Sequence, residues 1–155
     1  MKLLHFQKDR YIFHLEKWEK HLLTLILRLY PVIPSAHQPV SKSAASDDKA
    51  NQRLLDEALA EQRNENKKLV EALLADASRF RDTKAAARLR LSAVDVVWLL
   101  QVLNDVRVGN WILLGSPEVV DFWSLDADDR NAPYARAMEL AGFFQMRLLE
   151  AVRKA

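Results

Sequence analysis

The sequence predicts a mainly α-helical fold, a helical bundle of about five helices around a central apolar helix. The first observation is that apolar residues recur every three or four positions along most of the chain, which is the spacing of one helical face. The second is that residues 93–114 are apolar on nearly every side, as expected for a helix that others enclose. A chain of 155 residues, 50% of them hydrophobic, can bury one core, so we expect a single helical domain over residues 1–155.

The N-terminal segment favours a strand followed by a helix. Residues 11–15 alternate in character and are rich in β-branched and aromatic side chains, so we expect a short strand there. Residues 3–6 can pair with it, which would add a small N-terminal β-hairpin to the bundle. From Glu16 to the residue before Pro31 the period becomes helical. The expected core-facing positions of this helix are Trp18, Leu22, Leu25, Ile26 and Leu29.

Residues 31–48 are rich in proline and serine and contain few large apolar groups, so we expect a flexible loop. A long helix should follow over about 49–77, with leucines towards both ends. Gln62 and Asn66 interrupt its apolar stripe. We interpret this middle part as exposed to solvent, and the sequence leaves open whether the segment is one helix or two.

The second half of the chain contains clear helix boundaries. Ser92 and Asp95 have the spacing of a capping box that begins the central helix, 93–114. Residues 115–117, Gly-Ser-Pro, are typical of a helix end followed at once by a new helix, so we expect a short helix there. A last helix should begin at about residue 132. Its apolar stripe consists of Tyr134, Ala137, Met138, Ala141, Phe144, Leu148 and Val152.

The composition excludes several classes of function. Lys and Arg number 23 and Asp and Glu 21, so the net charge of +2 does not by itself imply a polyanionic partner. The absence of cysteine excludes disulfides and cysteine-ligated metals, and it favours a cytoplasmic location. The three glycines are isolated and the four histidines lack metal-ligand spacing, so we expect no cofactor and no metal. Neither a signal peptide nor a membrane span is evident, so we expect no membrane contact.

A polar trio, Asn104, Asp105 and Arg107, interrupts the apolar central helix. Buried polar groups are costly unless they are paired, so the trio is either a structural network or a site. Asp105 and Arg107 are two positions apart and cannot face each other. We therefore expect Arg107 to pair with a carboxylate such as Glu118 or Asp121, and Asp105 to pair with a basic segment or a helix N-terminus. The trio is predicted to be a structural polar network, and no arrangement of catalytic residues is evident.

A basic strip at 79–90 is the candidate contact for an anion or a partner. It contains one carboxylate, Asp82, and these basic residues: Arg79, Arg81, Lys84, Arg88 and Arg90. The acidic stretch 118–131 has the opposite charge, and we favour two solvated loops that partly neutralise each other over a nucleic-acid site. A helix-turn-helix around Gly115 is a poor DNA reader, because its second helix offers Glu118 and Asp121 but no Lys or Arg.

The C-terminal part of the chain resembles an uncharacterised bacterial domain family. The resemblance lies in LRLSAVDVVWLLQVLNDVRVGNWILL and, after a loop, in YARAMELAGFFQMRLLEAV. Members commonly show a short basic strand, an acidic helix start, a Trp and then Asn-Asp-Leu-Arg-Leu. Asn104, Asp105 and Arg107 match this motif, while Val106 and Val108 replace its leucines. The family's genes often lie beside that of the Clp-protease adaptor ClpS in actinobacteria, which implies a link to Clp-dependent proteolysis but no known activity.

These observations predict a non-enzymatic interaction or regulatory protein that has a protein partner. The resemblance, which covers roughly residues 49–152, connects that role with Clp-dependent proteolysis. The alternative is a nucleic-acid-binding regulator that uses the basic strip. An enzyme ranks third, since no reactive constellation is evident.

Overall fold

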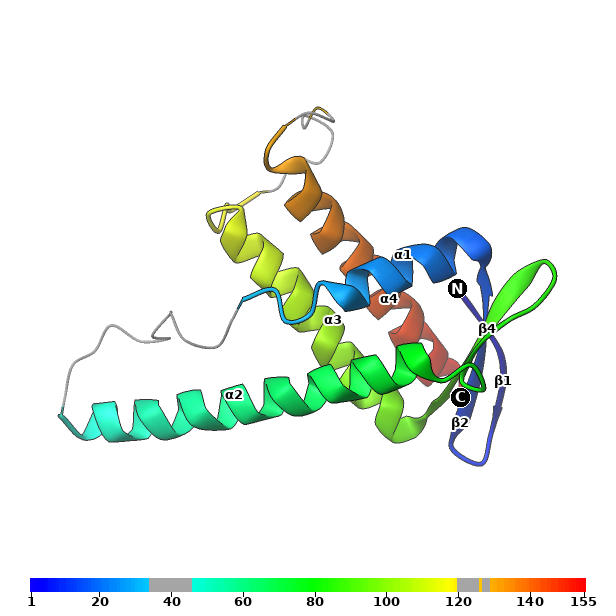
Figure 1. Cartoon of the computed structure of the whole chain (residues 1–155), viewed down its shortest axis with the longest axis horizontal. Helices are drawn as coiled ribbons and strands as arrows, with labels where there is room; N and C mark the ends of the chain where they lie inside the picture. The colour runs from blue at the N-terminus through cyan, green and yellow to red at the C-terminus, as the bar shows by residue number, and fades with distance from the viewer. Residues whose placement is uncertain (34–45, 120–125, 127–128) are drawn as a thin grey trace.

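The computed structural model describes residues 1–33, 46–119, 126 and 129–155. In these residues four helices pack beside a four-stranded antiparallel sheet (Figure 1). The prediction of a mainly α-helical bundle is therefore wrong, and the fold is a mixture of helices and sheet. The short helix expected after Gly115 is absent from 116–119, and the rest of that segment lies outside the described residues.

The sheet joins two hairpins that are far apart in the sequence. The first hairpin is the small N-terminal one that was predicted, and it turns at Lys8 and Asp9, whose φ angles of 50° and 58° suit a tight two-residue turn. A seven-residue antiparallel pairing connects it to the second hairpin, which was not predicted. The strands lie in the order β1-β2-β4-β3 and are β1 (Lys2–Gln7), β2 (Arg10–Glu16), β3 (Phe80–Asp82) and β4 (Ala86–Ser92).

One face of the sheet is apolar and packs on the helices. Tyr11, Phe13 and Leu15 of β2 are buried, and so are Leu89 and Leu91 of β4. Each set follows the period of two that places alternate side chains on one face. The other face carries the polar and charged residues of the same strands and is open to solvent. The second hairpin was missed because its Arg-Leu-Arg-Leu alternation was interpreted as a charged strip.

The helix α1 (Lys17–Arg28) packs on the sheet, α3 and α4 with a face that shares only Ile26 and the partly buried Leu22 with the predicted one. Leu23, Ile26 and Leu27 are buried, whereas Trp18 is 56% exposed. Leu25 and Leu29, which were also expected to face the core, are exposed. The segment is so rich in leucine that more than one helical stripe is apolar. The packing of α1 against α3, α4 and the sheet therefore decides which stripe is buried.

The helix α3 (Ala93–Leu113) contacts every other helix as well as β4. It begins with the predicted capping box, in which the Asp95 N–H donates to Ser92 Oγ (3.1 Å) and the Ser92 N–H donates to Asp95 Oδ2 (2.7 Å). The helix α4 (Ala132–Lys154) lies alongside it (Figure 1). One side of α3 is open, since Val108 and Trp111 are 43% and 39% exposed.

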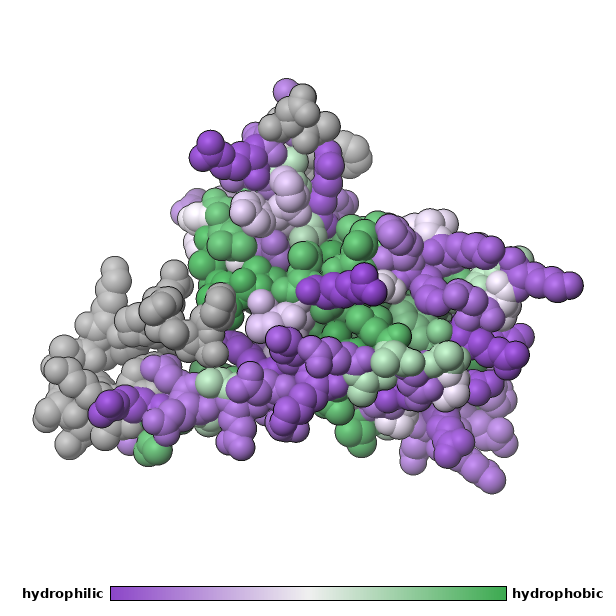
Figure 2. Space-filling model, in the orientation of Figure 1, coloured by the Kyte–Doolittle hydropathy of each residue, from purple (hydrophilic) through white to green (hydrophobic). Residues whose placement is uncertain are grey.

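The helix α2 (Ser46–Ala75) is a single helix that projects from the rest of the molecule (Figure 1). Hydrophilic side chains cover most of its visible surface (Figure 2). Its C-terminal part packs on the core, where Val70 and Leu73 are buried. Asn66, which we expected to be exposed, is only 2% exposed, while Gln62 is exposed as expected.

Candidate functional site

The polar trio of α3 is divided between two sides of the helix. Asn104 and Arg107 are exposed, whereas Asp105 is partly buried and faces the end of α1. Successive residues of an α-helix are turned by about 100°, so positions 104 and 107 lie nearer to each other around the axis than either lies to position 105. The trio therefore does not form one network, and its two parts have different surroundings.

Asp105 belongs to a buried polar cluster between α1, α2 and α3. The Tyr30 hydroxyl donates to Asp105 Oδ2 over 3.5 Å, and the side chain of Asn66 contacts the same hydroxyl. Burial raises the pKa of Asp105, while the positive charge of Arg63 and the hydrogen bond from Tyr30 act in the opposite direction. Among the described residues Asp105 pairs with neither the basic strip nor a helix N-terminus. This cluster ties three helices together.

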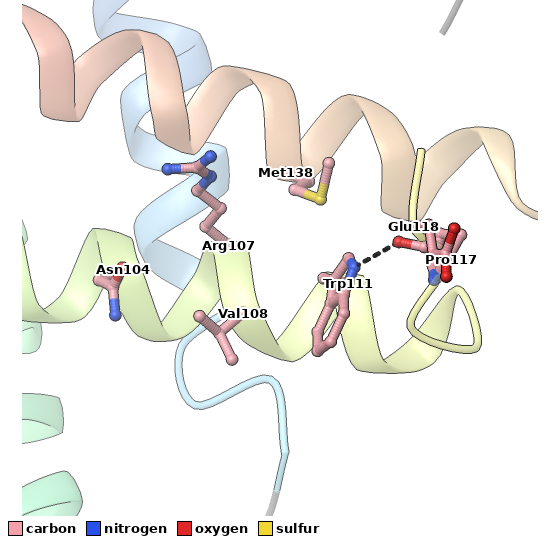
Figure 3. Close-up of a pocket in the computed structure, with 7 residues that line it drawn as sticks. All are labelled: Asn104, Arg107, Val108, Trp111, Pro117, Glu118 and Met138. Atoms are coloured by element: carbon pink, nitrogen blue, oxygen red, sulfur yellow. Dashed lines mark hydrogen bonds between the residues drawn. The ribbon is translucent and has the colours of Figure 1, made fainter. Parts of the chain in front are cut away.

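Asn104 and Arg107 line an open groove of about 410 Å³ between α3 and α4 (Figure 3). Trp111 forms part of its wall, and the indole Nε1 donates to the Pro117 carbonyl oxygen over 3.0 Å. This hydrogen bond holds the aromatic ring in place at one end of the groove. Met138 projects into the groove from α4 (Figure 3). The groove therefore combines one cation, one amide, the carboxylate of Glu118 at its far end and adaptable apolar side chains.

Arg107 extends from α3 towards α4 and away from Glu118 (Figure 3). No ion pair among the described residues includes Arg107, so the expected pairing with Glu118 is not observed. Asp121, the other expected partner, lies outside the described residues. A methyl group at Gly142 would lie 3.9 Å from Arg107 Nε, so the side chain passes close to α4.

A second hollow, of about 480 Å³, continues along α4 on the other side of Arg107. Met146 and Leu149 line it and are 48% and 56% exposed. Arg107 lines both hollows, so its guanidinium stands between two partly apolar depressions.

The basic strip forms β3, β4 and the turn between them. Arg81, Arg88 and Arg90 are exposed on the outer side of the sheet, because they alternate with buried residues of the core face. Arg79 precedes β3 and is partly buried, and Lys84 is exposed in the turn. The structure thus places four of the five basic residues along one hairpin surface.

Asp95 connects Arg79 with the N-terminus of α3. Arg79 Nη2 lies 2.8 Å from Asp95 Oδ1 without the geometry of a directional hydrogen bond, and Trp98 Nε1 donates to the same oxygen over 3.0 Å. Burial pushes the pKa of Asp95 upwards, but hydrogen bonds from Ser92 and Trp98 and the charge of Arg79 hold this pKa below its usual value. Asp95 is therefore a structural carboxylate that forms an ion pair with one residue of the basic strip, Arg79.

The described part of the acidic stretch lies far from the basic strip. The strip precedes the N-terminus of α3, whereas Glu118 follows its C-terminus, and the 21 residues of this helix span about 32 Å. That distance is about three Debye lengths at 0.1 M salt. The basic strip and the described part of the acidic stretch are therefore electrostatically independent.

In the part of the chain that the structure describes, no group of three or more His, Asp or Glu side chains is placed to hold a metal ion. None of the described helices is long and apolar enough to cross a membrane. No protein-family model matches the chain, and no curated protein or solved structure does either.

The sequence did not identify three residues as parts of these sites: Tyr30, Asn66 and Trp111. Asn66 interrupts an apolar helical stripe, and this position was a usable signal. A polar residue in such a stripe can be buried when its side chain is paired. Tyr30 and Trp111 gave no distinct signal, because aromatic residues in apolar segments are ordinary core residues.

Proposed function

We propose that this protein is a non-enzymatic interaction protein with a regulatory role, and that it binds a segment of a protein partner in the groove between α3 and α4. The observation that supports this most directly is Arg107, an exposed cation that forms no ion pair with a described carboxylate and stands between two hollows. A cytoplasmic location belongs to the same proposal, because the chain has no cysteine that would need an oxidising compartment.

The chemistry of the groove suits a peptide segment. Arg, Trp and Met are enriched in the central part of protein interfaces, and flexible Met side chains adapt to different partners. Trp111, Met146 and Leu149 are all more than a third exposed, although their side chains are apolar. The best ligand is therefore a segment that presents one carboxylate to Arg107 and apolar side chains to either hollow.

The family resemblance suggests where the partner is to be found. It links Asn104, Asp105 and Arg107 to a family whose genes neighbour that of ClpS. We therefore include a role in Clp-dependent proteolysis in the proposal, with the adaptor ClpS as the first partner to test. Two of the three motif residues line the groove, so a change at Arg107 tests the motif and the groove together.

The experiment compares the wild-type chain with Arg107→Glu and with Arg136→Glu as immobilised baits for cell lysate and for purified ClpS. Arg136 is also exposed on α4 but does not line the groove, so its variant controls for the change in charge. We expect one protein to be captured in a stoichiometric amount by the wild type and by Arg136→Glu, and lost with Arg107→Glu. Capture that is unaffected by Arg107→Glu would exclude the groove, and capture that does not include ClpS would remove the Clp link.

A further inference from the structure

The outer face of the sheet carries a row of basic side chains that crosses all four strands. Lys2 of β1 lies opposite His14 of β2, His14 lies opposite Arg88 of β4, and Arg88 lies opposite Arg81 of β3. Directly opposite residues of antiparallel strands project from the same face, with Cβ atoms about 4.5–5.5 Å apart. Three charged side chains and one imidazole therefore form a line across the sheet.

Three further arginines lie beside this row. Arg90 is two positions from Arg88 and shares its face, and its backbone N–H donates over 2.8 Å to the carbonyl oxygen of Arg79, which lies in the turn before β3. Arg10 of β2 joins them at the border of a recess of about 580 Å³. The end of the molecule that bears the sheet is correspondingly hydrophilic (Figure 2). Residues from both hairpins thus contribute to one basic surface.

Two carboxylates also line the recess, and both are engaged by the protein itself. Asp95 pairs with Arg79 and caps α3. Asp76 accepts the backbone N–H groups of Ser78 and Arg79 over 2.8 and 3.3 Å. Arg10 and Arg90, by contrast, form no ion pair among the described residues.

The row itself is almost free of negative charge. Glu16 contacts His14 (3.1 Å), and Asp82 pairs with Lys20 of α1 (2.8 Å) rather than with the row. Three members of the row form no ion pair with any described residue: Lys2, Arg81 and Arg88. The basic face is therefore open to an external polyanion.

This arrangement opposes folding, because like charges that lie directly opposite each other destabilise a sheet. It is not a consequence of composition either, since the net charge of the whole chain is only +2. We propose that the outer face of the sheet binds the phosphodiester backbone of a nucleic acid. Successive phosphates neutralise the row together with Arg10 and Arg90, and the counterions that are released drive binding.

Recognition of individual bases should contribute little to the binding of a nucleic acid at this face. Sheets that select single-stranded bases stack them on exposed aromatic rings. Here the aromatic residues of the described strands face the core: Phe6, Tyr11, Phe13 and Phe80. Binding should therefore depend strongly on salt and weakly on nucleotide sequence. This surface lies on the sheet, apart from the α3–α4 groove, so the inference is independent of the proposed function.

The test is fluorescence anisotropy with a labelled DNA of about 20 nucleotides and mixed sequence, used as a single strand and as a duplex at about 50–200 mM salt. The wild type should bind at least one form, and the affinity should fall steeply with salt. The double variant Arg81→Ala/Arg88→Ala should bind at least about tenfold more weakly at the low-salt end. The slope of log affinity against log salt should decrease by about 1–2. Arg81→Lys/Arg88→Lys should retain most of the binding, because it keeps the charge.

The matched control is Lys67→Ala/Arg136→Ala, which removes the same charge from exposed positions on α2 and α4. It should bind like the wild type, and thermal melting verifies that every variant is folded. The proposal is overturned if neither DNA form binds at about 50 mM salt, or if the control pair weakens binding as much as the sheet pair. Binding to phosphatidylserine vesicles without binding to DNA would assign the face to a membrane surface instead.

Discussion

Arg81 of β3 and Arg88 of β4 lie directly opposite each other on the solvent face of the sheet. The neighbouring pair, Phe80 and Leu89, is buried on the core face. A slip of one residue would turn the arginines into the core, so the apolar pair holds the register in spite of the repulsion between the charges. The like-charged pair is therefore tolerated by the fold and does not contribute to its stability.

The substitution Arg81→Thr should raise the free energy of unfolding by about 0.2–1 kcal/mol at low salt, because it removes the repulsion and places a β-branched residue in a strand. The gain should shrink at high salt, where charges are screened. Urea denaturation at low and high salt measures both effects. Arg81→Lys keeps the charge and serves as the control. A loss of stability in Arg81→Thr would show that the arginine makes a stabilising contact.

The substitution Arg107→Ala should change the free energy of unfolding by less than about 0.5 kcal/mol, because the side chain is exposed and forms no ion pair with a described residue. Removing one member of a buried ion pair would instead cost about 3–5 kcal/mol. Urea denaturation distinguishes the two cases. A loss in the larger range would restore the hypothesis that Arg107 is a structural tie.

The raised pKa of Asp105 predicts a specific pH dependence of stability. A carboxyl whose folded-state pKa is raised stabilises the fold below its unfolded pKa, about 3.9, and this contribution is lost as the pH rises through the folded pKa. Asp105→Asn cannot ionise, so its stability should fall less than that of the wild type between pH 4 and pH 7. Chemical denaturation across this range is the measurement. A steeper fall in the variant would contradict the assignment.

Asp95 should affect the pH dependence of stability in the opposite direction from Asp105, because the folded-state pKa of Asp95 is lowered. The stabilisation that ionised Asp95 provides is present above the unfolded-state pKa and disappears as the pH falls through the folded-state pKa. Asp95→Asn should therefore cost about 1–2 kcal/mol at neutral pH, through loss of the charged cap and of the pairing with Arg79. The difference from wild type should vanish in strong acid, and a difference that is constant with pH would count against this explanation.

The two glycines of the packed helices should respond differently to alanine. A methyl group at Gly109 would lie 2.8 Å from Val32 Cβ, so the chain would have to move, whereas one at Gly142 finds ordinary contact at 3.9 Å from Arg107 Nε. Overpacking costs about 1–3 kcal/mol, against a gain of about 1 kcal/mol in helix propensity. Thermal melting should show Gly109→Ala less stable and Gly142→Ala equal to or more stable than wild type. The reverse order would refute the close approach of residue 32 to α3.

Several elements could be predicted because their signals are local. The capping box of Ser92 and Asp95 begins α3 as expected, and the period of two in residues 11–15 marks β2. The helical face of α1 could not be predicted, since its run of leucines permits more than one apolar stripe. Asn66 was placed in solvent because the sequence does not show that Tyr30 and Asp105 meet it in the core.

The sequence identified individual residues of the candidate sites, but it did not show how these residues assemble into surfaces. Polarity within an apolar helix was the signal that selected Asn104, Asp105 and Arg107. The positions of α1, α2 and α4 then determine that Asp105 joins a buried cluster while the other two line an open groove. The groove also needs side chains from α4, such as Met138, which carry no polar signal in the sequence.

The sequence alone determined where α3 begins, the first hairpin and the clustering of arginines between residues 79 and 90. The tertiary structure decided that three of these arginines, Arg81, Arg88 and Arg90, lie on one sheet face with Lys2 and Arg10. The physical reason is that alternation along a strand is a local property, whereas the partner of a strand is chosen by burial of a shared apolar face. Here β2 and β4 are separated by two helices and a hairpin strand, so no local pattern specifies their pairing.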